Sequence, residues 1–191
     1  MRRLSDLFYR FRGEWALLFA GLLLFLPRRL DATPASLLCA ALFLLGGGFL
    51  RVQSRRVIGP HTRAGELDAP RLVRAGTYSR MRHPLYLANL LAGWGMVLLS
   101  GVAAPQALWL ALGWAAVCAG LGAGEDRYLR ERFGAEWERW AERTPFWGWG
   151  EGGEADPGAR SALAAFLSDG WTWAWQAILA VALAAPWERP W

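Results

Sequence analysis

Long apolar runs separated by short arginine-rich segments organise this sequence of 191 residues. A helix rises ~1.5 Å per residue, so about 20 apolar residues are needed to cross a hydrocarbon core of about 30 Å. Four runs approach that length, at residues 15–30, 35–52, 84–103 and 105–124. The first is short, and with the second it predicts a hairpin. The pattern predicts an all-α, polytopic membrane protein without a sheet.

The carboxyl-terminal part has a different pattern, because its apolar run is rich in tryptophan and interrupted by the polar residues 168–170. Tryptophan is enriched where a membrane meets water. We therefore predict a short interfacial helix that ends at Leu167, followed by a span over residues 171–185. The preceding residues 148–158 are rich in Gly and Glu and predict a flexible loop. The tail brings the expected number of transmembrane helices to about five.

Composition supports the membrane class, since 54% of the residues are hydrophobic, 19% are charged and 13 are Trp. The net charge of +5 comes from 21 basic residues, all of them arginine. Such a charge also suits nucleic-acid binding, but these arginines flank the apolar runs, and no run of base-stacking aromatics accompanies them. We expect no nucleic-acid partner.

The positions of the arginines predict the orientation of the chain in the membrane. Positive charge is concentrated in cytoplasmic segments. Eight arginines lie between the second and third spans, and five follow the fourth. This predicts an integral membrane protein, in the inner membrane if the cell is bacterial, with the amino terminus and both segments cytoplasmic. Arg28 and Arg29 are the exception, since this topology places them outside.

The first stretch that could carry chemistry runs from Gly76 to Tyr86 and ends at the start of the third span. Arg82 offers a planar fork suited to a carboxylate, and His83 can donate from both nitrogens when protonated. Pro84 fits the first turn of a helix, whose positive end favours anions. The stretch predicts an anion-binding corner, although each residue taken singly also fits an ordinary membrane boundary.

The second stretch begins with Glu125 and Asp126, where the fourth span is expected to end. Carboxylates are disfavoured at the carboxyl end of a helix, so this pair should have a cationic or hydroxyl-bearing partner, either an arginine or a ligand. The rest of a predicted helix over residues 125–147 is amphipathic and is expected to lie on the membrane surface.

No metal site is predicted, because no metal-ligand spacing is present. Cys39 and Cys118 lie inside apolar runs and are interpreted as small buried hydrophobic residues.

The motifs resemble those of the isoprenylcysteine carboxyl methyltransferase and phospholipid methyltransferase group of membrane enzymes, over roughly residues 72–147. The matching residues are Gly76, Tyr78, Arg82, His83, Pro84, Leu85, Tyr86, Gly93, Trp94, Gly95, Glu125, Asp126, Phe133, Gly134 and Glu136. Four positions depart from the usual pattern, namely Ala88, Asp126, Trp137 and Trp140. The departures leave the identity of the methyl acceptor open.

The resemblance implies methyl transfer from S-adenosylmethionine to a small or lipid-like acceptor, and a cofactor site on the cytoplasmic face. The cofactor-binding residues that we infer are Arg82, His83, Tyr86, Gly93, Gly95, Glu125 and Asp126. In this hypothesis Arg82 and His83 hold the methionine carboxylate, while Glu125 binds the amino group or the ribose hydroxyls. The glycine pair alone is commoner as a helix-packing notch.

The resemblance also divides the chain into a membrane methyltransferase core at residues 1–150 and a loop plus Trp-rich tail at residues 151–191. The acceptor could be a prenylated thiol carboxylate, a phospholipid amine, a small thiol or a quinone-like phenol, entering between the third and fourth spans. Two other functions fit the helical pattern: a membrane reductase, and a non-enzymatic assembly or transport factor. The sequence leaves the oligomeric state open.

Overall fold

The computed structural model describes residues 11–58, 69–152, 155–156 and 158–185. In these ranges the chain forms seven α-helices and one 3-10 helix, and no strand, which confirms the all-α class. The elements are α2 (Arg12–Phe25), α3 (Pro34–Ile58), η2 (Gly76–Ser79), α4 (Pro84–Ser100), α5 (Ala104–Phe133), α6 (Ala135–Arg143), α7 (Ala162–Leu167) and α8 (Gly170–Ala184).

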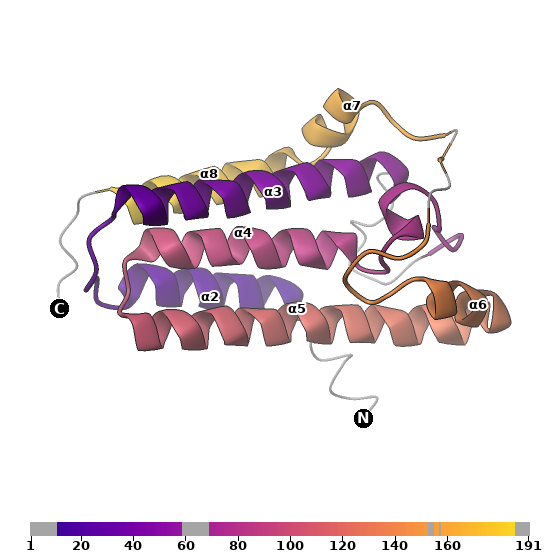
Figure 1. The fold of residues 1–191 in the computed structure, drawn as a ribbon, viewed down its shortest axis with the longest axis horizontal. Helices are drawn as coiled ribbons and strands as arrows, with labels where there is room; N and C mark the ends of the chain where they lie inside the picture. The colour runs from indigo at the N-terminus through magenta and orange to yellow at the C-terminus, as the bar shows by residue number, and fades with distance from the viewer. Residues whose placement is uncertain (1–10, 59–68, 153–154, 157, 186–191) are drawn as a thin grey trace.

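The long helices run side by side along one axis, with α4 in contact with α2, α3, α5 and α8 (Figure 1). One end of the bundle, which we call the motif end, carries η2, α6, α7 and the start of α4. The opposite end, which we call the hairpin end, carries the turn between α4 and α5. The motif end therefore collects segments that are far apart in the sequence.

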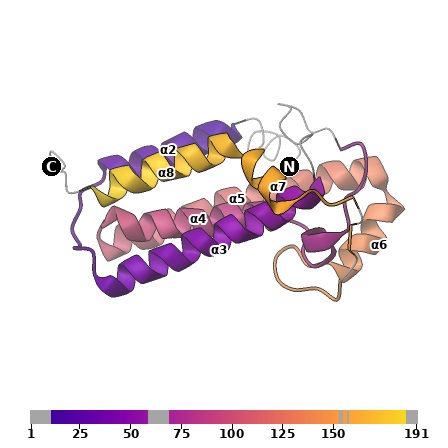
Figure 2. The same cartoon turned by 90° about the horizontal axis from the view of Figure 1, so that it is seen from above.

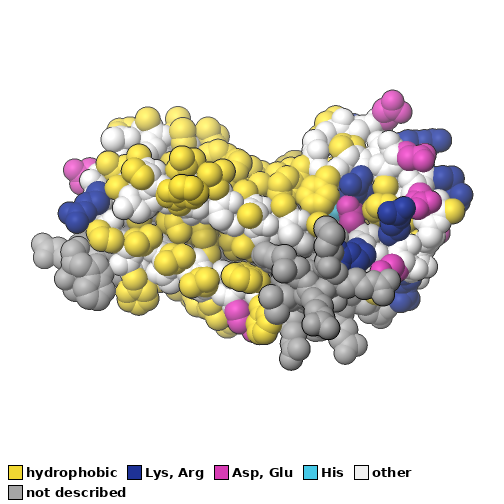
Figure 3. Space-filling model, turned by 90° about the horizontal axis from the view of Figure 1, so that it is seen from below, with side chains coloured by type: hydrophobic (Ala, Val, Ile, Leu, Met, Phe, Trp, Pro, Cys, Tyr) yellow, Lys and Arg dark blue, Asp and Glu magenta, His cyan; other side chains and the backbone are white. Residues whose placement is uncertain are grey.

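Two helices, α3 and α5, are long and apolar enough to cross a membrane, while α4 and α8 are apolar but shorter. Only 11% of the apolar window of α3 is buried, unlike the core helix of a soluble protein. Its outward residues include Leu38, Leu42, Leu45 and Phe49. Figure 3 shows a broad apolar surface, with most charged side chains of that face gathered at one end. These features describe a membrane protein, and the count of five spans stays a prediction.

The largest difference from the sequence prediction concerns α5. This helix does not end at residue 124 but continues to Phe133, so that Glu125 and Asp126 lie inside it. Residues 125–133 are mostly good helix formers and include no proline, and Gly134 ends the helix with a positive φ of 52°. The predicted separate helix over residues 125–147 is therefore wrong. Only α6 turns away, and residues 125–133 extend the axis of the spanning helix.

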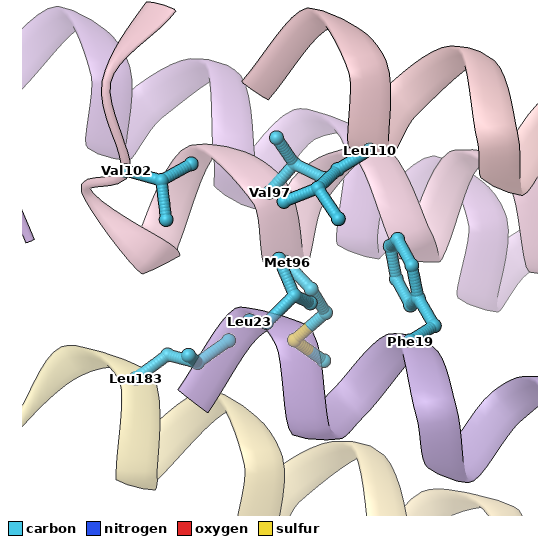
Figure 4. Close-up of a cluster of buried hydrophobic side chains, with 7 residues drawn as sticks. All are labelled: Phe19, Leu23, Met96, Val97, Val102, Leu110 and Leu183. Carbon is cyan, nitrogen blue, oxygen red and sulfur yellow. The ribbon is translucent and has the colours of Figure 1, made fainter. Parts of the chain in front are cut away.

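The first two helices run in opposite directions, as a hairpin does, but the main packing partners of α2 are α4, α5 and α8. Figure 2 shows α2 beside α8. An apolar cluster joins these helices and holds the carboxyl-terminal helix in the bundle (Figure 4). Its buried members are Phe19, Leu23, Met96, Val97, Val102, Leu110 and Leu183. The polar break at residues 168–170 separates α7 from α8, as the sequence pattern predicts.

Arg28, the exception in the predicted charge pattern, forms hydrogen bonds with α8 at the hairpin end. Its Nη1 donates to the carbonyl oxygens of Leu183 and Ala185, each at 3.5 Å, at the carboxyl end of α8. A cation is favoured there because the last carbonyls of a helix lack partners and carry partial negative charge. The backbone of Arg29 donates to the Gly101 carbonyl at 2.8 Å. These bonds fasten the first connection to the α4–α5 turn.

Two glycines bring α3 and α4 into close contact. A Cβ on Gly47 would lie 2.8 Å from the Ala88 oxygen, and one on Gly95 would lie 2.8 Å from Leu44 Cγ. Small residues let membrane helices approach each other in this way. Gly95 is therefore a packing residue of the α3–α4 interface. Cys39, on the same helix α3, is exposed, so its interpretation as a buried residue is wrong, whereas Cys118 is buried.

Candidate active site

The motif loop is held by backbone and side-chain contacts from α6. Gly76 has a φ of +59°, and a Cβ there would lie 2.6 Å from Val57 Cγ2. The following turn buries Tyr78, whose carbonyl accepts a hydrogen bond from Trp140 Nε1 at 3.0 Å. Burial first, and the nearby Glu125 second, raise the pKa of the Tyr78 hydroxyl, so that it stays protonated. Trp140, one of the four residues that depart from the usual motif pattern, therefore holds the motif loop in place.

The segment after α6 lies directly against the motif loop. The backbone nitrogens of Arg82 and His83 donate to the carbonyls of Pro145 and Phe146, at 2.9 and 3.3 Å. Gly150 donates in turn to the Arg80 carbonyl at 2.7 Å. Residue 150 belongs to the stretch predicted as a flexible loop, and here it is paired with the motif. The site therefore includes residues 145–150.

Arg82 joins the motif loop to α5 and α6. Its Nε donates to Asp126 Oδ2 at 3.2 Å, and its Nη1 donates to the carbonyls of Ala141 and Thr144 at 3.2 and 2.7 Å. These partners show that Asp126 has the cationic partner that the sequence predicts. They also show that two of the three guanidinium nitrogens bind the protein itself.

His83 lies between the two carboxylates of α5. Its Nε2 is 2.9 Å from Asp126 Oδ1, although outside the angle of a hydrogen bond, and its Nδ1 is 3.7 Å from Glu125 Oε2. The side chain is only 1% exposed. Burial alone lowers the pKa of His83, but the carboxylates of Asp126 and Glu125 outweigh burial and raise it above its ordinary value of 6.5. The geometry favours an imidazolium.

Gly122 makes room for this histidine, and sequence reasoning missed that role. A Cβ at Gly122 would lie 3.2 Å from the His83 ring and 2.6 Å from Phe146 Cζ. The Phe146 ring centroid is 4.5 Å from that of His83, and the Tyr86 centroid is 5.7 Å away. Residues three apart on a helix share a face. The three-residue spacing of Gly122 and Glu125 places both on the helix face that meets His83, and this spacing can be read from the sequence.

A cavity of about 1340 Å³ opens beside these residues, with walls from α2, α3, α4, α5 and α8. Of the predicted site residues, the cavity is lined by Arg82, His83, Tyr86, Gly93 and Glu125. Asp126 does not line the cavity but contacts Arg82 and His83, and Gly95 packs against α3. A Cβ on Gly93 would lie 2.2 Å from Trp114 Nε1, so this glycine admits an indole to the cavity wall. Gly93 therefore lines the cavity, whereas Gly95 lies outside it in the α3–α4 interface.

The cavity wall is both apolar and strongly cationic. Its apolar part includes Phe19, Met96, Trp114 and Leu179. Among the described residues, seven arginines and two carboxylates line it as well. The arginines are Arg12, Arg51, Arg55, Arg56, Arg71, Arg82 and Arg160, and the carboxylates are Glu125 and Asp169. Within the part of the chain that the structure describes, no group of His, Cys, Asp and Glu side chains could hold a metal ion.

This arrangement agrees with what sequence comparison shows. Residues 35–136, more than half of the chain, match the family model described as phospholipid methyltransferase. The fold and the match define a membrane methyltransferase, and the chain belongs to the phospholipid methyltransferase family. The matched region contains α3, η2, α4 and α5, whereas α2, α7 and α8 lie outside it. Searches among curated proteins and among solved structures find no match.

Proposed function

We propose that this protein transfers a methyl group from S-adenosylmethionine to a lipid-like acceptor at the motif end of the bundle. The observation that carries the proposal is the pairing of His83 and Glu125 on the wall of a large cavity, in a chain of this family. Methyl transfer from a sulfonium needs alignment and exclusion of water more than a protein nucleophile. The cavity beside His83 and Glu125, with its partly apolar wall, is a place where a cofactor and an acceptor could be aligned.

The side chains present suit the amino-acid part of the cofactor. An imidazolium and a carboxylate 3.7 Å apart complement the carboxylate and ammonium groups of an α-amino acid. In this proposal His83 Nδ1 donates to the methionine carboxylate, and Glu125 accepts from the ammonium group or from ribose hydroxyls. Tyr86 packs beside them. Arg82 and Asp126 act mainly as positioning residues, since they bind each other and the backbone.

The acceptor approaches from the membrane in this proposal, but by another route than the sequence suggests. Trp94 Nε1 donates to the Ala111 carbonyl at 3.2 Å and Trp114 Nε1 to that of Asn89 at 2.9 Å, so hydrogen bonds tie α4 to α5. The cavity is instead lined by residues of α2 and α8 that are also exposed, such as Leu17 (57%) and Trp171 (75%). An apolar acceptor would pass these side chains.

Three measurements on purified protein in an uncharged detergent test the function. Calorimetry should show saturable binding of S-adenosylmethionine, and methyl-labelled cofactor should transfer its label to lipids extracted from the host membrane. Adding an alkyl chain to a water-soluble amine, thiol or carboxylate should increase its turnover. Absence of cofactor binding in folded protein would exclude the methyltransferase proposal, and efficient turnover of soluble acceptors without gain from the chain would exclude membrane entry.

The orientation is a second proposal: the motif end faces the cytoplasm. In a variant without Cys39 and Cys118, Arg74→Cys at the exposed motif end should react only with membrane-permeant thiol reagents in intact cells. Asp31→Cys, exposed at the hairpin end, is the matched control and should react with impermeant reagents too. The reverse labelling pattern would show the opposite orientation.

A further inference from the structure

The ring of Phe146 packs on the imidazole of His83 without reaching the cavity. The two ring centroids are 4.5 Å apart, and the ring planes make an angle of 51°. Gly122 lies on the other side of this contact, on α5. Of these three residues, only His83 lines the cavity. Phe146 and Gly122 can therefore affect a ligand in the cavity only through the histidine.

The tip of the Phe146 ring occupies the space that a side chain at Gly122 would need. A Cβ at Gly122 would lie 2.6 Å from Phe146 Cζ, and 3.2 Å from each of two atoms of the His83 ring. The first of these distances is shorter than any ordinary contact of a Cβ, so a methyl group here would displace one of the rings. The glycine lets both rings pack on the same turn of α5.

Neighbouring contacts fix the position from which the Phe146 ring projects. The Phe146 carbonyl accepts a hydrogen bond from the His83 backbone nitrogen at 3.3 Å. One residue earlier in each segment, the Arg82 guanidinium donates to the nearby Thr144 carbonyl at 2.7 Å. The Trp147 ring meets the Phe146 ring edge-on, with the centroids 5.1 Å apart. The aromatic ring is therefore held by the backbone and by a second ring.

Charged groups reach the imidazole from α5 and from the motif loop. Asp126 and Glu125 lie 2.9 and 3.7 Å from its two nitrogens. Arg82 precedes His83 and is paired with Asp126, and the Tyr86 ring lies 5.7 Å away between centroids. The second side-chain torsion of a histidine is broad, so ion pairs alone leave the ring plane free to turn. An aromatic ring packed on one face restricts that torsion.

We propose that Phe146 is a positioning residue for cofactor binding: its ring fixes the plane of the His83 imidazole against Gly122. The histidine then loses little side-chain freedom when the cofactor binds, which favours binding. Phe146 lies beyond residue 136, where the match to the family model ends. The role in cofactor binding rests on the proposed function, whereas the effect of Phe146 on the histidine does not.

A double-mutant cycle in cofactor binding tests the role. Phe146→Leu should raise the Kd for S-adenosylmethionine by about fivefold, because the imidazole loses the ring that orders it. In the His83→Ala background the same substitution should change Kd by less than about twofold, since Phe146 acts through the histidine. Phe146→Met, which keeps an apolar side chain of similar length, replaces Phe146→Leu in the cycle if the latter does not fold.

Phe49→Leu is the matched control for this cycle. Phe49 is an exposed residue of α3 outside the cavity, so the same substitution there should leave Kd unchanged. A residue with a merely structural role would weaken cofactor binding equally in both backgrounds, and that result would overturn the proposal. An unchanged Kd in folded Phe146→Leu would also overturn it, while leaving the methyltransferase function intact.

Gly122→Ala tests the contact from the side of α5. Its Cβ would meet both rings, so Kd should rise by at least about tenfold. Phe146→Leu removes Cζ, the atom closest to that Cβ, so the double variant should bind the cofactor at least about threefold more tightly than Gly122→Ala alone. Equal or weaker binding in the folded double variant would contradict the packing of Phe146 on this turn.

Histidine NMR measures the effect without the cofactor, in the His61→Gln background, where His83 is the only histidine. The fixed surroundings of His83 raise its pKa above 6.5, so a freer ring in Phe146→Leu should titrate closer to 6.5. Phe49→Leu should titrate like the unaltered ring. An unchanged titration in folded Phe146→Leu would reject the positioning role. The expected shift in a chain that binds no S-adenosylmethionine would support the positioning of His83 and reject the methyltransferase function.

Discussion

His83→Ala and Glu125→Ala should each weaken the binding of S-adenosylmethionine by about 1–3 kcal/mol, the range for losing a charge-assisted hydrogen bond. This corresponds to roughly a 5- to 150-fold rise in Kd. The reason is local: the two side chains lie 3.7 Å apart on the cavity wall and are proposed to bind the two charged groups of the methionine moiety. Each variant removes one of these contacts.

Calorimetry on detergent-purified protein measures the effect. Arg139→Ala is the matched control, since Arg139 is an exposed residue of α6 outside the cavity and should leave Kd unchanged. Thermal unfolding of each variant separates loss of binding from loss of fold. If both motif variants are folded and bind the cofactor as tightly as the unaltered chain, the site assignment is wrong.

Asp126→Asn should lower the pKa of His83 and move cofactor binding to lower pH. The Asp126 carboxylate, with Glu125, raises the pKa of His83 above its ordinary 6.5, against the effect of burial. The imidazolium therefore contributes fully below about pH 6.5, both to the folded state and to holding the methionine carboxylate. That contribution is lost as pH rises through the raised pKa. Without the Asp126 charge, the loss begins at lower pH.

Histidine NMR measures this shift directly, because the chain has only two histidines. His61→Gln assigns the signals, and His61 lies outside the described residues. Calorimetry at a series of pH values should show the fall in cofactor affinity following the His83 titration, in the unaltered chain and in Asp126→Asn alike. An unchanged His83 titration in folded Asp126→Asn would show that this carboxylate does not hold the proton.

The cavity is built partly from the region that matches the family model and partly from residues outside the match. His83 and Glu125 belong to α4, its preceding loop and α5, all within the matched region. The walls that α2 and α8 contribute lie outside it. Because α8 lines the cavity but does not carry His83 or Glu125, exchange of residues 158–185 is expected to alter the acceptor more than the cofactor.

Several features of this protein follow from its sequence alone. Apolar runs of spanning length and their flanking arginines predicted a helical membrane protein, since these depend on local composition and on the thickness of a bilayer. Pro84 predicted the start of α4, because proline fits the first turn of a helix. The motif around His83 and the pair Glu125 and Asp126 also predicted the family that the comparison confirms.

Other features depended on the tertiary structure. A run of glycines followed by charged residues did not reveal that α5 continues to Phe133, because the stop at Gly134 depends on its backbone conformation. Gly93 and Gly95 are alike in sequence, yet one admits Trp114 and the other meets Leu44, since neighbouring helices decide what fills each space. Arg51 and Asp169 are 118 residues apart, and only the packing of α8 into the bundle joins them across the cavity wall.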